Sequence, residues 1–386
     1  MPEMMYIRAM GRTIHIQDAA LPSTGFSLML KPVGSACNLG CRYCYYLDKG
    51  AGGRMSLEVL EKAICSYADA CQGPELNFIW HGGEPLLLGV DFYRAAVALE
   101  RRYSSGRPVF NSIQTNGTLI TPEWAAFFRK HNFLVGISID GPRDIHDQYR
   151  QDRSGQPCFD RVVRGLGYLR DAGVQFNTLT TVNHYSEGRG ADVYCFLKQL
   201  GSHHMQFLPV VEFGSDTSVS ALGFGRFMAD VFDVWVQGDV GQYYVQLFDA
   251  ALAAWCGLPP GLCTLGRRCE GTAVIENGGD VYLCDHCVDD AHRLGNIMET
   301  QLSELMARAD VESFAAAKMS ALPPRCRACQ WLPACNGECP VHRPSADSVN
   351  ALCEGYRLFF DHAAPTLDRM RALLASGQAP GQVMSI

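Results

Sequence analysis

The pattern of apolar and polar positions divides the chain into two parts. From residue 26 to about residue 211, short apolar, β-branched runs alternate with amphipathic stretches. This alternation is typical of βα units around a parallel sheet. The predicted strands are Phe26–Pro32, Leu76–His81, Val109–Thr115, Leu134–Asp140, Gln175–Val182 and Met205–Val210. The predicted helices between them are Ser56–Cys71, Val90–Arg102, Thr121–His131, Asp160–Ala172 and Ala191–Leu200.

The second part begins with a connection, residues 214–220, that is rich in Gly, Ser and Asp. Two helices are predicted next, at Leu222–Gln237 and Gln242–Cys256. From Cys263 onward, glycine and cysteine replace a regular apolar pattern, as expected where bound clusters substitute for part of a core. We therefore predict an N-terminal extension (1–25), an α/β domain (26–213), a helical connection (214–256), a small cysteine-rich domain (257–374) and a frayed tail (375–386).

Six parallel strands with outer helices fit either a doubly wound sheet or an incomplete barrel, and both bind ligands at the carboxyl ends of their strands. Distinctive polar segments follow the first four predicted strands. They are the cysteine loop after residue 32, Gly82-Gly83-Glu84-Pro85, Gln114-Thr115-Asn116-Gly117 and Ser138-Ile139-Asp140-Gly141. We expect these segments to meet at one rim of the sheet.

Composition and charge narrow the range of partners. With 47% hydrophobic and 19% charged residues, the chain resembles an ordinary globular protein. Its 33 basic and 40 acidic residues give a net charge of −7, which provides no electrostatic footprint for nucleic acid. No apolar run has the length of a bilayer span, and residues 1–12 lack the plan of a secretory signal. We expect a cytoplasmic protein with no nucleic-acid or membrane partner.

The seventeen cysteines point to metal or cluster chemistry, because structural disulfides are rare in the cytosol. The first group is Cys37-x3-Cys41-x2-Cys44, directly after the first predicted strand. Three thiolates can hold a 4Fe–4S cluster and leave one iron open for an outside ligand. The alternative is a zinc or electron-transfer site with a fourth ligand from elsewhere.

Two further groups, downstream of the first, contain eight cysteines in total. They are Cys263-x5-Cys269-x14-Cys284, and Cys326-x2-Cys329-x5-Cys335-x3-Cys339 followed by Cys353. Eight ligands divided by four per site gives two fully coordinated clusters. A pair of zinc knuckles is the alternative.

The first motif, with the glycine-rich segment after the second strand, resembles the radical S-adenosylmethionine enzymes. This resemblance implies a partial (β/α)6 TIM-type barrel and a 4Fe–4S cluster whose open iron binds S-adenosylmethionine. It also implies that Tyr43 lies on the adenine side, Gly83 at the methionyl end, Ser138 and Arg150 at the polar groups, and Val211 at an apolar contact of the cofactor.

The downstream cysteines resemble the SPASM extension of radical enzymes that modify peptides and proteins. That pattern implies two auxiliary 4Fe–4S clusters, so the chain is expected to use three clusters. The inner auxiliary cluster takes Cys263, Cys269, Cys284 and Cys339, and the outer one takes Cys326, Cys329, Cys335 and Cys353.

Asp285, directly after Cys284, narrows the resemblance to anaerobic sulfatase-maturating enzymes. The resemblance implies oxidation of a cysteine or serine of a sulfatase to Cα-formylglycine, with Asp285 as general base and an auxiliary cluster as electron acceptor. It also implies ferredoxin or flavodoxin as electron donor, and we expect a monomer. Cys287 departs from the family pattern: a buried filler is the favoured interpretation, and an alternative ligand or redox-active thiol stays open.

Two other functions fit parts of the pattern. A SPASM maturase that forms thioether or carbon–carbon crosslinks in a ribosomal peptide would share the cofactor and the clusters. Only about 25 residues precede the first predicted strand, too few for a leader-binding domain, which counts against it. The third possibility is an iron–sulfur electron-transfer or scaffold protein without radical chemistry.

Overall fold

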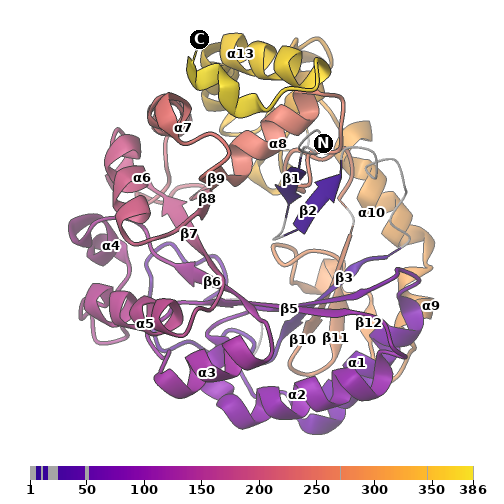
Figure 1. Ribbon diagram of the computed structural model, residues 1–386. Helices are drawn as coiled ribbons and strands as arrows, with labels where there is room; N and C mark the ends of the chain where they lie inside the picture. Colours follow the sequence, from indigo (N-terminus) through magenta and orange to yellow (C-terminus); the bar gives the residue numbers. More distant parts are fainter. Residues whose placement is uncertain are drawn as a thin grey trace.

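The computed structural model describes residues 6–9, 12–15, 25–47, 52–269, 271–345 and 347–385. Its main feature is a curved ten-stranded sheet with the order β12-β11-β10-β3-β4-β5-β6-β7-β8-β9 (Figure 1). In that order the strands are Gly295–Asn296, Asp280–Tyr282, Thr272–Glu276, Ser27–Lys31, Leu76–Trp80, Val109–Thr115, Leu134–Ser138, Phe176–Val182, His204–Pro209 and Tyr244–Val245. The first two strands of the chain, β1 (Tyr6–Ala9) and β2 (Arg12–His15), form a separate antiparallel pair.

All neighbours from β10 through β3 to β9 pair in parallel, and β11 and β12 are antiparallel additions. In the described part of the chain, the edge strands β12 and β9 do not pair with each other, so the barrel is open. The predicted α/β partial barrel is therefore confirmed. The six predicted strands correspond to β3 to β8, and β5 has the predicted bounds.

Helices α1 to α6 lie along the outside of the curved sheet, and α13 packs against α7 and α8 (Figure 1). From α1 to α6 they are Leu57–Ala70, Val90–Tyr103, Pro122–Lys130, Arg143–Tyr149, Phe159–Asp171 and Gly190–Gln199. From α7 to α13 they are Ala221–Gly238, Gln246–Trp255, Leu302–Met306, Ala309–Ser320, Pro324–Arg327, Leu332–Cys335 and Cys353–Ala375. None of them, within the described residues, combines the length and apolar character that crossing a bilayer requires.

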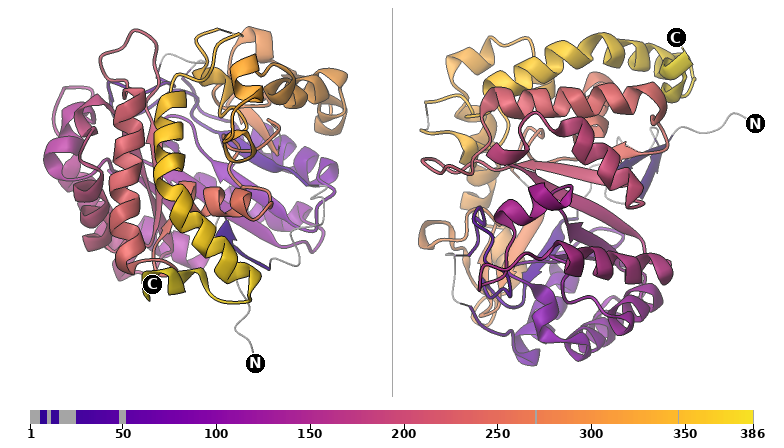
Figure 2. Two further views of the ribbon diagram at one scale, coloured as in Figure 1. Left: turned by 90° about the horizontal axis from the view of Figure 1, so that it is seen from above. Right: turned by 90° about the vertical axis from the view of Figure 1, so that its left-hand side faces the viewer.

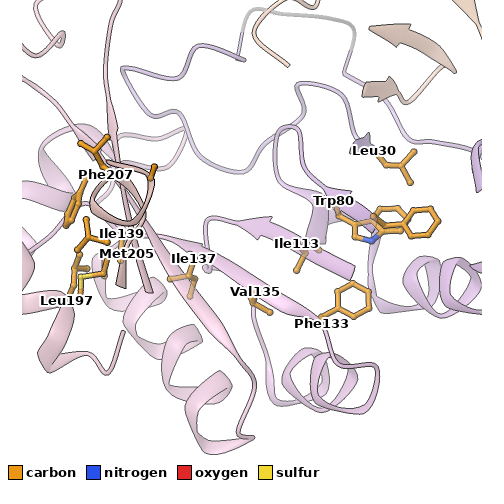
Figure 3. Close-up of a cluster of buried hydrophobic side chains, with 14 of the residues drawn as sticks. Leu30, Trp80, Ile113, Phe133, Val135, Ile137, Ile139, Leu197, Met205 and Phe207 are labelled. Carbon is orange, nitrogen blue, oxygen red and sulfur yellow. The ribbon is translucent and has the colours of Figure 1, made fainter. Parts of the chain in front are cut away.

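The core lies between the sheet and this helical layer. Figure 3 shows side chains from successive strands in one buried cluster, among them Leu30 on β3, Trp80 on β4, Ile113 on β5 and Ile137 on β6. Along β4 and β5, alternate residues are buried, as expected for a pleated strand. This packing fixes the strand ends that carry the polar loops.

Regular structure continues after residue 257, where the sequence pattern predicts little of it. Strand β10 pairs in parallel with β3, so the cysteine-rich segment extends the same sheet. Helices α13 and α7 run side by side (Figure 2). The tail also differs from the predicted frayed segment: residues Pro380–Ser385 form a 3-10 helix and Val383 is buried against the main core. Burial of the Val383 side chain against the core stabilises this segment.

Candidate active site

The three cysteines of the first group lie together on the loop after β3. Cys37 and Cys41 interact electrostatically with each other and with Cys44. Burial, with the nearby Glu84, raises the pKa of Cys37 to about 12. Burial likewise raises the pKa of Cys41 to about 11. Three half-buried thiols whose ionised forms would repel one another fit a site in which a cationic iron centre stabilises the thiolates.

The loop is held by the segment that follows α4. The Gly40 N–H donates to the Gln151 carbonyl oxygen at 2.8 Å, and the Arg42 N–H donates to the Tyr149 carbonyl oxygen at 3.1 Å. An antiparallel bridge between residues 39 and 152 lies beside these bonds. The first cysteine group is therefore anchored to the end of α4 and the residues that follow it.

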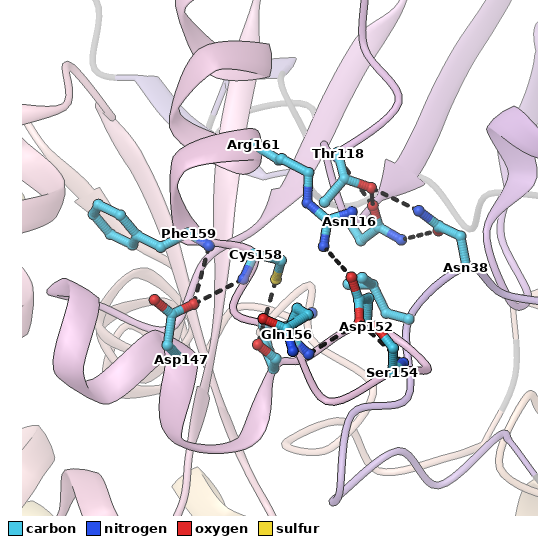
Figure 4. Close-up of polar contacts among 12 residues, drawn as sticks. Asn38, Asn116, Thr118, Asp147, Asp152, Ser154, Gln156, Cys158, Phe159 and Arg161 are labelled. Atoms are coloured by element: carbon cyan, nitrogen blue, oxygen red, sulfur yellow. Dashed lines mark hydrogen bonds and ion pairs between the residues drawn. The ribbon is translucent and has the colours of Figure 1, made fainter.

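Polar groups from the cysteine loop itself and from the residue after β5 reach the sulfur of Cys37. The Leu39 N–H donates to Cys37 Sγ at 3.4 Å, and Asn116 Nδ2 approaches the same sulfur at 3.8 Å. Asn116 Nδ2 also donates to Asn38 Oδ1 at 2.9 Å, and Asn38 Nδ2 donates to Thr118 Oγ1 at 2.9 Å (Figure 4). Donors aimed at a sulfur stabilise its thiolate form, which is the form that ligates iron.

The glycine-rich segment after β4 packs directly against the cysteine loop. The Gly83 N–H donates to the Gly34 carbonyl oxygen at 2.8 Å, and the Glu84 N–H donates to the Ala36 carbonyl oxygen at 2.8 Å. A Cβ at Gly83 would lie 2.0 Å from that Ala36 oxygen, so only glycine fits.

Glu84 joins this segment to β5, a role that was not predicted from the sequence. Its fully buried carboxylate accepts hydrogen bonds from the Leu86 N–H at 3.1 Å, Thr115 Oγ1 at 2.8 Å and the Asn116 N–H at 2.8 Å. Burial raises its pKa to about 7, against the effect of these three donors. An acidic residue beside two glycines and a proline was the available signal.

Tyr43 and Arg150, both predicted cofactor contacts, meet at the carboxylate of Asp140. The Tyr43 hydroxyl donates to Asp140 Oδ2, and Arg150 Nε lies 3.1 Å from the same oxygen. The Arg150 guanidinium also lies 5.5 Å from the centre of the Tyr43 ring. The structure therefore brings together two residues from loops that are far apart in the sequence.

The other predicted cofactor contacts lie around the same mouth. Ser138 ends β6 and accepts a hydrogen bond from Gln114 Nε2 at 2.9 Å. Val211 is half-buried against the main core. The preceding residue, Val210, is the one that packs in a buried cluster with Tyr43.

The second cysteine group and Cys339 form one cluster of thiols. Cys263 interacts electrostatically with Cys284 and Cys269, and Cys339 interacts with Cys284 and Cys263. The N–H groups of His286 and Cys287 donate to the Cys284 sulfur. The thiols and their amide donors fit a four-ligand iron–sulfur site.

The other four downstream cysteines line a cavity of about 430 Å³. Its lining includes Cys326, Cys329, Cys335 and Cys353, with Tyr356 on one side. Cys335 interacts electrostatically with both Cys353 and Cys326. The eight downstream cysteines thus lie in two groups of four thiols, which is the division that the resemblance to the SPASM extension implies.

Asp285 lies between the first cysteine loop and the second cysteine group. Tyr45 Oη donates to Asp285 Oδ2 at 2.7 Å, and the Tyr45 ring stacks on His286 with centroids 4.6 Å apart. Lys31 Nζ donates to the Asp285 carbonyl oxygen at 3.4 Å. Burial raises the pKa of Asp285, but the facing His286, His81 and Lys31 outweigh it and bring the pKa to about 2.

Cys287 lies against the same thiol cluster. Its N–H donates to the Cys284 carbonyl oxygen at 3.1 Å, and its thiol is hydrogen-bonded to the Cys284 sulfur. It also interacts electrostatically with Cys339. The structure places this thiol beside the predicted ligands, a position that fits a buried filler, an alternative cluster ligand and a redox-active thiol alike.

Comparison with known proteins agrees with this arrangement. The family model described as "Radical SAM superfamily" matches residues 32–191, and the model described as "Iron-sulfur cluster-binding domain" matches residues 263–330. A serine-type anaerobic sulfatase-maturating enzyme of Bacteroides thetaiotaomicron is 42% identical over 92% of this chain and 94% of its own. A cysteine-type enzyme of Clostridium novyi is 32% identical over 91% and 99%.

The chain belongs to the anaerobic sulfatase-maturating enzymes. A solved structure described as native anSMEcpe with bound AdoMet has a TM-score of 0.84 and 31% identity, covering 90% of this chain and 99% of that one. A second structure of that protein also contains the Cp18Cys peptide. This anaerobic sulfatase-maturating enzyme is therefore a radical S-adenosylmethionine enzyme with S-adenosylmethionine and three 4Fe–4S clusters as cofactors.

Proposed function

We propose that the chain oxidises the target side chain of a sulfatase at the junction between the first cysteine loop and Asp285. The observation that carries this proposal is the 2.7 Å hydrogen bond from Tyr45, one residue after Cys44, to the Asp285 carboxylate. It holds a carboxylate beside the loop where radical chemistry starts. An electron-transfer or scaffold protein would not need a carboxylate at this place.

The cysteines are assigned to three clusters. Cys37, Cys41 and Cys44 hold the cluster that binds S-adenosylmethionine. The inner auxiliary cluster takes Cys263, Cys269, Cys284 and Cys339, and the outer one takes Cys326, Cys329, Cys335 and Cys353. When bound, S-adenosylmethionine and its cluster supply hydrogen-atom abstraction at the substrate Cβ, and the auxiliary clusters supply an electron acceptor.

The residues at the barrel mouth orient S-adenosylmethionine. The Tyr43–Asp140–Arg150 contact fixes the ring of Tyr43 for the adenine side. Gly83 leaves room for the methionyl end, Ser138 and Arg150 contact the polar groups of the cofactor, and Val211 offers an apolar contact. The five contacts, by Tyr43, Gly83, Ser138, Arg150 and Val211, are proposals from the family resemblance, supported by the position of these residues at or after the carboxyl ends of parallel strands of one sheet.

Asp285 takes the proton of the substrate hydroxyl or thiol. Its low pKa keeps the carboxylate ionised at neutral pH, and Tyr45 holds one of its oxygens in place. Loss of one hydrogen atom from Cβ, one proton to Asp285 and one electron is together a two-electron oxidation. It gives an aldehyde directly from serine and a thioaldehyde from cysteine, which becomes the aldehyde when water replaces the sulfur and hydrogen sulfide leaves. This balance supports formylglycine as the product.

The target side chain includes serine. The serine-type relatives share 42%, 36% and 37% of their aligned residues with this chain, and the cysteine-type relatives share 31–32%. Ferredoxin or flavodoxin as electron donor, a monomeric state and a cytoplasmic location stay predictions from the sequence.

The test is anaerobic incubation of the reconstituted enzyme with two peptides that share a sulfatase motif and differ only in Ser or Cys. Mass spectrometry is expected to find the aldehyde from the Ser peptide. Asp285→Asn is expected to lower aldehyde formation by about 10²–10⁴-fold, the usual effect of losing a general base. It should still cleave S-adenosylmethionine.

The control is Asp290→Asn, which changes an exposed aspartate of the same segment. It is expected to keep wild-type activity. A crosslinked product in place of the aldehyde would instead support the peptide-maturase alternative. Full activity of Asp285→Asn would reject the general-base assignment.

A further inference from the structure

Lys318 is a fully buried cation beside the second cysteine group. It lies on α10 with no exposed surface. Its Nζ donates to the Cys263 carbonyl oxygen at 2.8 Å and to the Thr264 carbonyl oxygen at 2.7 Å. Three residues earlier on the same helix, the Ala315 carbonyl oxygen accepts the Cys269 N–H at 3.1 Å. Helix α10 therefore places the ammonium group between two of the cysteines.

The ionisable groups around this ammonium group are mostly thiols. Lys318 interacts electrostatically with Cys269, Cys263 and Cys339, three of the four residues assigned to the inner auxiliary cluster. An ammonium group has three N–H donors, and two of them are used by the carbonyl oxygens. Among the described residues, the third has no hydrogen-bond acceptor, so it is available to a sulfur of the bound cluster.

Glu338 is the opposing charge. It is buried, interacts electrostatically with Lys318 and Cys339, and precedes Cys339 directly in the sequence. Its Oε2 lies 3.0 Å from His342 Nδ1 and accepts a hydrogen bond from Asn350 Nδ2. The carboxylate is therefore shared between Lys318 and its own two partners, and the ammonium group of Lys318 has this carboxylate, two carbonyl dipoles and three thiols around it.

A buried cation of this kind raises the electron affinity of an iron–sulfur cluster beside it. Reduction of any 4Fe–4S centre with four thiolate ligands adds one negative charge to a site that is already negative. A fixed positive charge stabilises the reduced form more than the oxidised form, and a low-dielectric interior strengthens the effect. Hydrogen bonds to the sulfurs shift the potential in the same direction.

We propose that Lys318 raises the reduction potential of the inner auxiliary cluster, so that this cluster accepts the electron released by substrate oxidation. The proposal rests on the ligand assignment made above. Lys318 acts through the cluster and is therefore a positioning residue. Nothing in the reaction requires it to touch the peptide.

The test compares midpoint potentials in the reconstituted full-length enzyme by redox titration followed by electron paramagnetic resonance. The variants are Lys318→Met and Lys318→Gln, which remove the charge, and Lys318→Arg, which keeps it. If Lys318→Met loses iron, Lys318→Gln decides the question, because its amide can still donate to the same carbonyl oxygens. Lys198→Met is the control, since Lys198 Nζ binds the Asp239 carboxylate on the outer helices.

The neutral variants are expected to make reduction of one auxiliary cluster at least tenfold less favourable, which is about 59 mV for a one-electron couple. Lys318→Arg and Lys198→Met are expected to keep the wild-type potential. The cluster whose paramagnetic resonance signal responds to added S-adenosylmethionine should keep its midpoint potential in every variant.

An unchanged or higher potential in Lys318→Gln with full iron content would overturn the proposal. An equal fall in Lys318→Arg would do so as well, because it would show that packing and not charge matters. Failure of the proposed function has a different signature: the wild-type enzyme would form no aldehyde, whatever the potentials are.

Discussion

Two buried carboxyl groups show how neighbouring residues decide the cost of burial. Asp140 faces the cation of Arg150 at 3.1 Å and the hydroxyl of Tyr43. Glu100 on α2 is 2% exposed and accepts one hydrogen bond, from Asn111 Nδ2 at 2.8 Å. A buried charge needs an opposite charge or several donors to be stable. Burial therefore raises the pKa of Glu100 to about 8.

This shift makes the stability of the enzyme depend on pH. The folded-state pKa of Glu100 is above the ordinary value of 4.5, so its contribution is complete below pH 4.5 and is lost as pH rises through about 8. Between pH 6 and pH 8, the wild type is expected to lose about 1–2 kcal/mol of unfolding free energy relative to Glu100→Gln. Anaerobic urea unfolding of the holoenzyme at both pH values measures this difference.

Glu123→Gln is the matched control, because Glu123 is an exposed carboxylate on the neighbouring helix α3. It is expected to follow the pH dependence of the wild type. If Glu100→Gln loses stability with pH as steeply as the wild type does, Glu100 is ionised in the folded state and the expected linkage is absent.

At the scale of the elements, the sequence predicts what depends on local pattern. The bounds of Val109–Thr115 match β5 because buried and exposed residues alternate and clear turns follow. Strand β10 was missed because its partner β3 is far away in the chain. The signal was present as Thr272–Glu276, an apolar β-branched run followed by Asn277-Gly278-Gly279-Asp280, which is a hairpin pattern.

The contact between α7 and α13 depends on two glycines that the apolar pattern does not reveal. A Cβ at Gly225 on α7 would lie 2.5 Å from the Gly355 carbonyl oxygen on α13. Gly225→Ala is therefore expected to force the two helices apart and to cost about 1–3 kcal/mol of unfolding free energy. Thermal unfolding of the holoenzyme, with iron content measured in parallel, tests this expectation.

Gly167→Ala provides the control within another helix. A Cβ at Gly167 on α5 meets no atom within 4 Å, so alanine is expected to leave the stability equal or to raise it by up to about 1 kcal/mol. Equal melting temperatures for Gly225→Ala and Gly167→Ala would show that α7 and α13 can separate without cost.

At the scale of the whole molecule, one sheet joins the two functional regions. The first cysteine loop follows β3, and Cys284 and Asp285 follow β11, which pairs with β10 beside β3. Spacing in the sequence predicts each cysteine group, since a cluster demands thiols at short intervals. It does not predict the Tyr45–Asp285 contact, because that contact exists only once distant parts of the chain share a sheet.

This junction is expected to couple cleavage of S-adenosylmethionine at the first cluster to oxidation of the substrate beside Asp285. Tyr45→Phe keeps the ring that stacks on His286 and removes only the hydroxyl that donates to Asp285. A hydrogen bond to a charged group contributes about 1.5–3 kcal/mol, so aldehyde formed per 5′-deoxyadenosine is expected to fall by about tenfold or more. Chromatography of both products in one anaerobic reaction gives this ratio.

Tyr103→Phe is the matched control, because Tyr103 Oη donates to the Glu61 carboxylate at 2.6 Å on the outer helices. It is expected to keep the wild-type ratio of aldehyde to 5′-deoxyadenosine. If Tyr45→Phe also keeps that ratio, the carboxylate of Asp285 is held by its other neighbours, His286 and Lys31, and the junction does not depend on the tyrosine hydroxyl. A fall in 5′-deoxyadenosine itself would instead place Tyr45 at the first cluster, because cleavage of S-adenosylmethionine does not require Asp285.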